Sequence, residues 1–238
     1  PHVFVSQVQG PKALEVLANA VDDGCPERFR YFDIGRVSIA GQSVILSRSG
    51  FTNELGWEFY LQPDADARAI GDRILEAGKP FDMVPTGSVA FRTRRIEAGL
   101  LSAGSDFNAS DTPFCAGLGQ FVDLEKDNFI GKDALVAADK RRTIWGLQVD
   151  QGVAALGRTL TRDGLSVGTV CSSGWSPFQR CGVAIVQLDD PNLEPGAVLQ
   201  ATCGDGTIQT ARVCETPMYD AKREIPRGLL VDVPPATS

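Results

Sequence analysis

The chain has 238 residues, of which 43% are hydrophobic and 22% charged, and its formal net charge is −7. A chain of this length and composition can form one large or two modest domains of an ordinary globular protein. The negative charge argues against a general affinity for nucleic acid or anionic membranes, and no apolar run approaches the roughly 20 residues that a membrane helix needs. We therefore expect neither nucleic acid nor a membrane as a partner.

Cysteine and histidine usage limits the possible chemistry. The six cysteines are scattered without a C-x-x-C pair, unlike a zinc site or a redox motif. No secretory leader is visible, which predicts reduced thiols and a cytoplasmic location. His2 is the only histidine, so we expect no metal site and no nucleophilic system based on His. Any chemistry must then use carboxylates, Tyr, Lys, Arg, Cys or a cofactor.

The first part of the sequence alternates between strand and helix patterns. The order is strand, helix, strand, strand, helix, which predicts an α+β fold with an antiparallel sheet and helices on one face. Because a strand at residue 3 needs neighbours, we also expect an N-terminal portion that is missing or separately cleaved. The predicted strands are 3–9, 29–39, 43–47 and 57–61; the helices start at Gly10-Pro11 and at Pro63-Asp64, and the second ends at Gly78 and Pro80.

A third helix is predicted at residues 88–98, and it carries three arginines. These could bind an anionic tail, or they could form an ordinary solvated face paired with Glu97 or Asp82, which we favour because surface charge clusters usually contribute little. The loop at 99–113 is long and polar, and such loops are often functional. The arginines are Arg92, Arg94 and Arg95, and the side chains expected to face inward are Val89, Phe91 and Ile96.

The pattern changes towards the C-terminus. After a predicted short strand at 118–124 and a helix at 133–140, short strands alternate with Gly-bearing turns, which predicts a C-terminal all-β barrel or jelly-roll domain. We place the domains at residues 1–141 and 142–238, with the tail after Tyr219 draped or partly disordered. The predicted strands are 143–149, 158–162, 165–171, 182–188, 197–203 and 207–215.

The stretch from Ser47 to Leu61 is the most informative. Two strands are joined by a loop rich in Gly and Asn, and in the second strand Glu58 and Tyr60 share one face because side chains alternate along a strand. With Phe51 on the loop, this face could hold a flat heteroaromatic ligand, and the Glu58 carboxylate would accept hydrogen bonds from the N–H groups of that ligand. The alternative is an ordinary solvated sheet face.

Five motifs together resemble the folate-dependent aminomethyltransferase family, typified by the T protein of the glycine cleavage system. The resemblance covers nearly the whole chain and matches the middle and C-terminal parts of the family. The motifs are Q-V-Q-G-P-K-A (Gln7 to Ala13), S-R-S-G-F-T-N-E-L-G-W-E-F-Y (Ser47 to Tyr60), R-I-E-A-G-L (Arg95 to Leu100), F-I-G-K-D-A-L (Phe129 to Leu135) and S-S-G-W-S-P (Ser172 to Pro177).

The resemblance implies a site, a cofactor and a reaction. Glu58 would contact the amino-pyrimidine edge of tetrahydrofolate, with Phe51 and Tyr60 lining the cleft and Tyr31 and Trp175 as further wall residues. The implied reaction moves a methyl or aminomethyl group from a small sulfonium or amine donor to tetrahydrofolate. Family members fold as three domains around a folate channel, and their catalytic aspartate lies in the upstream part. The missing portion or a companion chain would therefore supply it, and no catalytic residue is assigned here.

One departure from the family pattern leaves other functions open. Phe91 stands where T proteins carry an arginine, and the wording from Ala77 to Phe107 is closer to dimethylsulfoniopropionate demethylase, a methyl-transferring relative. The alternatives are the folate-binding part of a flavin-dependent amine demethylase, a scaffold with a dead cleft, or a non-catalytic folate-binding protein that assists iron–sulfur maturation. The last is disfavoured because its motif cysteine is missing from Asn128 to Lys132.

Overall fold

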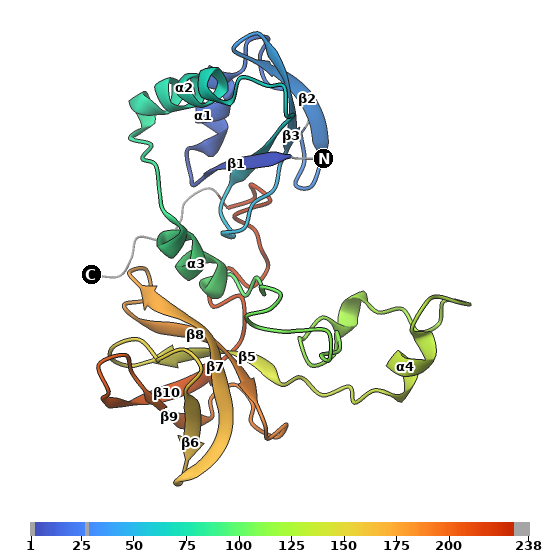
Figure 1. Ribbon diagram of the computed structural model, residues 1–238, viewed down its shortest axis with the longest axis vertical. Helices are drawn as coiled ribbons and strands as arrows, with labels where there is room; N and C mark the ends of the chain where they lie inside the picture. The colour runs from blue at the N-terminus through green and yellow to red at the C-terminus, as the bar shows by residue number, and fades with distance from the viewer. Residues whose placement is uncertain (1–2, 27–28, 231–238) are drawn as a thin grey trace. The chain divides into compact units, whose positions relative to one another are not determined.

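The computed structural model describes residues 3–26 and 29–230 (Figure 1). Contacts among them divide the chain into two compact units. The first contains residues 3–91 and 220–230, and the second contains residues 92–219. The chain thus leaves the first unit after Phe91 and returns to it at Asp220. The domain boundary expected near residue 141 stays a prediction, while the contacts group residues 92–141 with the strands that follow them.

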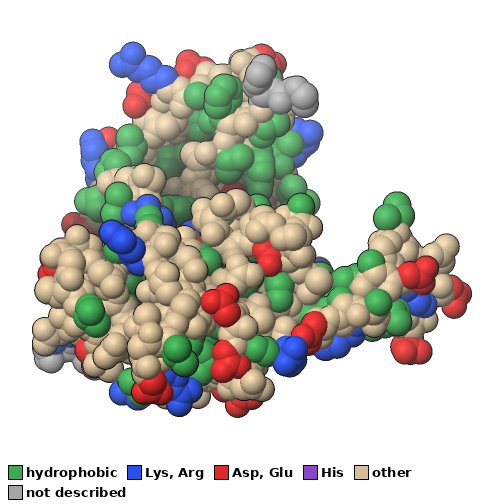
Figure 2. All heavy atoms as spheres, turned by 60° about the horizontal axis from the view of Figure 1, so that its bottom comes forward, with side chains coloured by type: hydrophobic (Ala, Val, Ile, Leu, Met, Phe, Trp, Pro, Cys, Tyr) green, Lys and Arg blue, Asp and Glu red, His purple; other side chains and the backbone are tan. Residues whose placement is uncertain are grey.

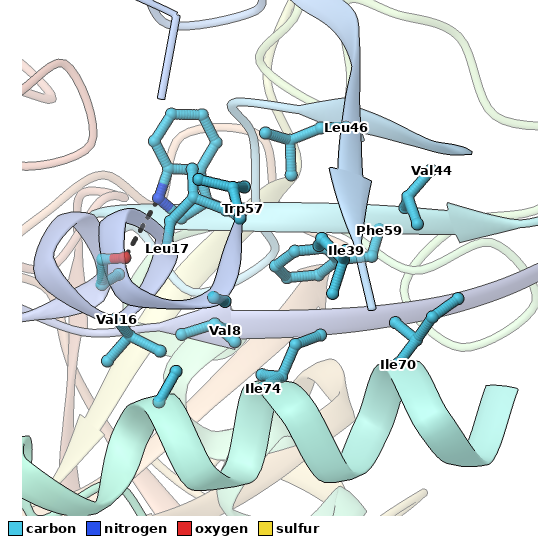
Figure 3. Close-up of a cluster of buried hydrophobic side chains, with 14 of the residues drawn as sticks. Val8, Val16, Leu17, Ile39, Val44, Leu46, Trp57, Phe59, Ile70 and Ile74 are labelled. Atoms are coloured by element: carbon cyan, nitrogen blue, oxygen red, sulfur yellow. Dashed lines mark hydrogen bonds between the residues drawn. The ribbon is translucent and has the colours of Figure 1, made fainter. Parts of the chain in front are cut away.

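A four-stranded antiparallel sheet forms the centre of the first unit, in the order β1-β4-β3-β2. Helices α1 and α2 lie against one face of it (Figure 3). This confirms the expected α+β arrangement. The strands are β1 (Phe4–Gln9), β2 (Ile34–Ile39), β3 (Gln42–Ser47) and β4 (Gly56–Leu61), and the helices are α1 (Ala13–Ala20), α2 (Ala67–Gly78) and the 3-10 turn η1 (Lys79–Phe81).

The core of this unit fills the space between the sheet and the helices. Trp57 and Phe59 of β4 are 3% and 1% exposed, and the indole Nε1 of Trp57 donates to the Ala13 carbonyl at 3.1 Å. Since side chains alternate along a strand, burial of these two rings directs Glu58 and Tyr60 to the opposite face, which α1 and α2 do not cover. The core residues labelled with Trp57 and Phe59 in Figure 3 are Val8, Val16, Leu17, Ile39, Val44, Leu46, Ile70 and Ile74.

Three details of the first unit differ from expectation. The strand expected from residue 29 begins only at Ile34, because Phe32 has a positive φ of 72° and the backbone turns there. Helix α2 begins at Ala67 because the side chain of Asp66 accepts from the first free backbone N–H groups of the helix and caps it. The apolar repeat of the first predicted helix, which includes Leu14, Val16 and Leu17, predicts a buried stripe, but Leu14 is 38% exposed.

The second unit contains a closed antiparallel barrel in the order β10-β5-β8-β7-β6-β9. Closure confirms the predicted C-terminal barrel, and it removes free sheet edges. Strand β7 has an irregular register between Val170 and Ser172, where it bends around the barrel. The strands are β5 (Ile144–Val149), β6 (Thr159–Arg162), β7 (Leu165–Ser176), β8 (Cys181–Leu188), β9 (Val198–Thr202) and β10 (Ile208–Cys214).

In the same unit, the segment between helix α3 (Ser88–Glu97) and strand β5 precedes the barrel, and we call it the extension. The strand expected at 118–124 is wrong: this segment forms the 3-10 turn η2 (Gly119–Phe121), closed by local backbone hydrogen bonds. The predicted helix is α4 (Lys132–Ala137). Figures 1 and 2 show this segment extending away from the barrel strands, with apolar side chains on its surface. Phe121 is 76% exposed, and Ile130 is fully exposed.

None of the helices in residues 3–26 and 29–230 has the length and apolar character needed to cross a bilayer. The same residues include no group of three or more His, Cys, Asp or Glu side chains that could hold a metal ion. All six cysteines are free thiols.

Candidate functional site

The candidate site lies on the sheet face opposite the helices of the first unit. Strand β4 supplies Glu58 and Tyr60, which are both half-buried. In the strand register, Gln7 of β1 lies opposite Glu58 on one side and Ser47 of β3 lies opposite it on the other. Directly opposite residues of antiparallel strands project from the same face. Glu58 is therefore the centre of a row of three polar side chains across the sheet.

Two hydroxyl groups hold the Glu58 carboxylate in place. Ser49 Oγ donates a short hydrogen bond to Glu58 Oε2, and the Tyr60 hydroxyl donates to the same oxygen at a longer 3.4 Å. Ser49 Oγ also lies 2.8 Å from Ser47 Oγ. Because a hydroxyl has one proton, Ser47 is the donor in that contact. Among the described residues, both hydrogen bonds to the carboxylate are accepted by Oε2. Oε1 can therefore accept hydrogen bonds from the N–H groups of a ligand.

The two tyrosines of the predicted site share the electrostatic environment of Glu58. Burial raises the pKa of Tyr60, and the adjacent Glu58 carboxylate raises it further. Burial also raises the pKa of Tyr31, where Arg223 acts in the opposite direction and Glu58 in the same one. Both phenols are thus protonated donors at neutral pH. The structure brings Tyr31, Glu58 and Tyr60 into one neighbourhood, and their role in ligand binding stays a prediction.

Phe51 lies on the loop that joins β3 to β4. Its ring is stacked on Phe91, with centroids 6.3 Å apart and planes inclined by 16°. Gln9 of β1 stabilises the loop. Its side-chain amide donates a hydrogen bond to the Ser49 carbonyl at 3.2 Å and accepts one from Thr52 Oγ1 at 2.8 Å. The Phe51 side chain is therefore restricted by its contact with Phe91 and by the hydrogen bonds of the loop.

The C-terminal segment at 220–230 holds the same loop from another side. Asn53 is 3% exposed with a φ of 60°, and its amide donates to Asp220 Oδ2 at 3.4 Å and accepts from Arg223 Nη1 at 3.0 Å. Arg48 donates to the Arg227 carbonyl at 3.3 Å. Ile225 is 1% exposed. The expectation of a draped or partly disordered tail is wrong for these residues, and positions beyond 230 lie outside the described chain.

Sequence reasoning missed this contribution from the C-terminal segment. Nothing in the local pattern links Asn53 to residues that follow it by about 170 positions. The one available signal is Asn53 itself, because Asn is one of the few residues that adopt a left-handed backbone readily. Trp175 lies on β7 of the second unit and is 45% exposed. Its part in a ligand site stays a prediction.

Two of the three arginines of α3, Arg94 and Arg95, do not belong to a solvated face. Arg95 is 6% exposed and donates to Asp106 Oδ2 at 2.6 Å and to Ser172 Oγ at 2.7 Å. Arg94 pairs with buried Glu97, as the sequence suggested, and also donates to the Tyr219 hydroxyl at 2.7 Å. The expectation failed because the loop at 99–113 brings Asp106 back to α3. Val89, expected to face inward, is 67% exposed, and Arg92 is exposed.

Comparison with known proteins matches both halves of the chain to one family. Residues 2–126 match the family described as GCVT N-terminal domain, and residues 142–220 match the glycine cleavage T-protein C-terminal barrel domain. An aminomethyltransferase of Desulfitobacterium hafniense is 37% identical over 217 residues, which is 89% of this chain and 58% of the relative. One from Caldanaerobacter subterraneus is 36% identical over 194 residues, covering 79% of this chain and 51% of the relative.

A solved structure is similar over most of the chain. The crystal structure of glycine cleavage system aminomethyltransferase T from Bartonella henselae superimposes with a TM-score of 0.78 at 26% identity. The match covers 92% of this chain and 60% of that structure. The chain thus spans between half and two thirds of the length of these relatives. On the two family matches and these relatives, the chain belongs to the glycine cleavage T-protein family.

Proposed function

We propose that this chain binds tetrahydrofolate at the Glu58 face and acts in folate-dependent aminomethyl transfer. The observation that carries the proposal is the fixed carboxylate of Glu58, whose Oε1 receives no hydrogen bond from the described residues. A carboxylate held in this way is suited to the paired N–H donors of an amino-pyrimidine ring. The relatives named aminomethyltransferase support the reaction class.

The residues present fit a reduced pterin. Glu58 offers a charged acceptor, the Tyr60 phenol fixes it, and the Phe51 ring offers an apolar surface on the loop before β4. Tyr31 adds a second protonated phenol near the same carboxylate. We propose that these four residues hold the pterin.

The share of this chain in the reaction is positioning. When bound, tetrahydrofolate supplies N5 as the acceptor of the one-carbon group. Glu58 fixes one edge of the ring, and the aromatic side chains restrict its tilt, so the acceptor atom keeps one position relative to the donor. Holding two reactants in this way removes much of the entropic barrier of a bimolecular step. By the family resemblance, a catalytic aspartate would come from a part of the protein outside this chain.

Calorimetric titration with tetrahydrofolate tests the assignment of Glu58. Glu58→Gln keeps the shape of the side chain and removes its charge, so we expect affinity to fall about tenfold or more, as for loss of a charge-assisted hydrogen bond. Glu76→Gln is the matched control, because Glu76 is exposed on α2 and pairs only with Lys79 among the described residues. Equal affinities of the wild-type and Glu58→Gln chains would reject the proposed site.

A second candidate reaction is methyl transfer from a methylated sulfonium or amine. The stacked Phe51 and Phe91 rings favour it, since aromatic faces attract methylated cations and Phe91 replaces the arginine of T proteins. Incubating the protein and tetrahydrofolate with dimethylsulfoniopropionate, glycine betaine, dimethylglycine or the aminomethyl-lipoyl donor, with mass spectrometry of the folate product, distinguishes the two. A methyl adduct supports the second reaction, and a methylene product from the lipoyl donor supports the first.

We also propose a partner for the exposed extension of the second unit. Phe121, Ile130 and Val136 are all more than half exposed on it. The relatives have further polypeptide that this chain does not match, and that part, in the same protein or in a companion chain, would cover these side chains. Addition of the region of a relative that this chain does not match should then protect the extension from limited proteolysis.

A further inference from the structure

Gln7 lies beside Glu58 with an unused acceptor. The register of β1 and β4 places the two residues directly opposite each other, so both side chains project from the ligand-facing side of the sheet. The Gln7 side-chain oxygen Oε1 is shielded from solvent and has no hydrogen-bond partner among the described residues. Buried polar atoms without partners are rare in native proteins, and each costs free energy unless something satisfies it.

The other glutamine of β1 is different. Gln9 uses both ends of its amide to hold the loop before β4, so its role is structural. Gln7 makes no such contact through Oε1, although Ser47, Ser49 and Tyr60 are hydroxyl donors grouped around the adjacent carboxylate. Those hydroxyl protons are committed to one another and to Glu58. Among the described residues no group donates to Gln7 Oε1, so a bound ligand can supply the donor.

We infer that Gln7 is a specificity-determining residue that accepts a hydrogen bond from the ring-edge amino group of the ligand. The inference rests on the proposed folate site and extends it. Glu58 Oε1 and Gln7 Oε1 form a pair of adjacent acceptors, one charged and one neutral. That pair matches an edge with a ring N–H and an exocyclic NH₂, because the amino group has a second proton left after the carboxylate has bound the first.

The chemistry predicts how ligands are discriminated. A ligand with the exocyclic amino group satisfies both acceptors, whereas one with a methyl group there leaves Gln7 Oε1 buried and unpaired. Sites built to hydrogen-bond a polar group reject analogues lacking it for this reason. The wild-type chain should therefore prefer tetrahydrofolate to its 2-desamino-2-methyl analogue, which keeps the ring N–H that Glu58 binds.

Calorimetry of the full chain with both ligands tests the role of Gln7. Gln7→Met retains the length of the side chain and removes the acceptor. We expect its affinity for tetrahydrofolate to fall roughly three- to tenfold, as for a neutral hydrogen bond, with little change for the analogue. Gln62→Met is the control, because Gln62 is exposed just after β4. Unchanged thermal unfolding of Gln7→Met establishes that the sheet is intact.

The outcomes separate this inference from the proposed function. If Glu58→Gln weakens tetrahydrofolate but Gln7→Met does not, or if Gln7→Met weakens both ligands equally, the role of Gln7 is wrong and the folate site stands. If the wild-type chain binds neither ligand, the proposed function fails first, and the inference with it. A loss confined to the ligand with the amino group supports the inference.

Discussion

At the scale of single residues, alternation along β4 was the useful signal. It predicted that Glu58 and Tyr60 share a face opposite Trp57 and Phe59, and the burial of the two rings confirms this. Sequence could not identify Ser49 or Gln7 as neighbours of Glu58. Their proximity depends on the pairing register of three strands and on a loop conformation, both fixed by contacts between distant residues.

Arg95 is a residue whose substitution we expect to be costly. It is buried with Asp106, whose side chain is fully shielded, and it also donates to Ser172. Arg95→Met leaves the carboxylate buried without its cation, so we expect the free energy of unfolding to fall by about 3–5 kcal/mol. Urea unfolding of the wild-type and Arg95→Met chains measures this loss of stability. The double variant Arg95→Met/Asp106→Leu should recover much of the loss, and a single-variant loss below about 1 kcal/mol would contradict the buried pair.

At the scale of elements, helices and barrel strands were predicted well because their periodicity is local. The beginning of β2 was misplaced because Phe32 turns the backbone in a way its side chain does not announce. The strand expected at 118–124 failed for a different reason. An apolar alternation becomes a strand only when another strand pairs with it, and in the described chain this segment closes on itself as η2.

The C-terminal segment supports the ligand loop through Asp220. Its carboxylate accepts from the backbone N–H groups of Glu224 and Ile225 and from Asn53. Asp220→Ala should lower the free energy of unfolding by about 1–2 kcal/mol through loss of these bonds. It should also reduce tetrahydrofolate affinity by about threefold or more, since the loop must then be ordered on binding.

The matched control for Asp220 lies in the barrel. Asp205 also accepts from nearby backbone and hydroxyl groups, those of Thr207, in a hairpin turn. Asp205→Ala should affect stability without changing ligand affinity. Chemical denaturation and calorimetry of both variants decide the matter: if Asp220→Ala destabilises the chain but leaves affinity unchanged, the segment supports the fold alone.

At the scale of the whole molecule, the sequence indicated a barrel but not the grouping of the elements. The return of residues 220–230 to the first unit depends on contacts such as Asn53 with Arg223. No composition shift marks them, because a short polar segment has the same texture whether it is packed or free. The closed order of the barrel is likewise a property of pairing, and alternating strands alone were equally consistent with a jelly roll.

Two partly buried thiols predict how stability changes at alkaline pH. Burial raises the pKa of Cys171 to about 11 and that of Cys214 to about 12, from the value of 9.0 expected in the unfolded chain. Their contribution to stability is complete below pH 9 and is lost as pH rises towards the folded values, by up to about 1.4 kcal/mol per pH unit for Cys214 and by less for Cys171, which solvent screens more. Unfolding measured from pH 8 to 11 should show this decline.

A serine substitution isolates the thiol effect. Cys214→Ser does not ionise in this range, so its stability should fall less steeply above pH 9 than that of the wild-type chain. Cys25→Ser is the comparison, because Cys25 is exposed and burial raises the pKa of its thiol less than that of Cys214, so its substitution should change the slope less. The same steep decline in Cys214→Ser and wild type would show that other groups cause it.

The late return of the chain to the first unit has a consequence during biosynthesis. The sheet, its helices and the loop that carries Phe51 emerge from the ribosome early, but Asp220, Arg223 and Arg227 emerge only after the whole barrel has been translated. Until then the nascent loop lacks the contacts that hold Arg48 and Asn53. A newly made chain should therefore acquire its ligand-ready loop last, and a ribosome stalled within the barrel would present a folded sheet with an unfinished site.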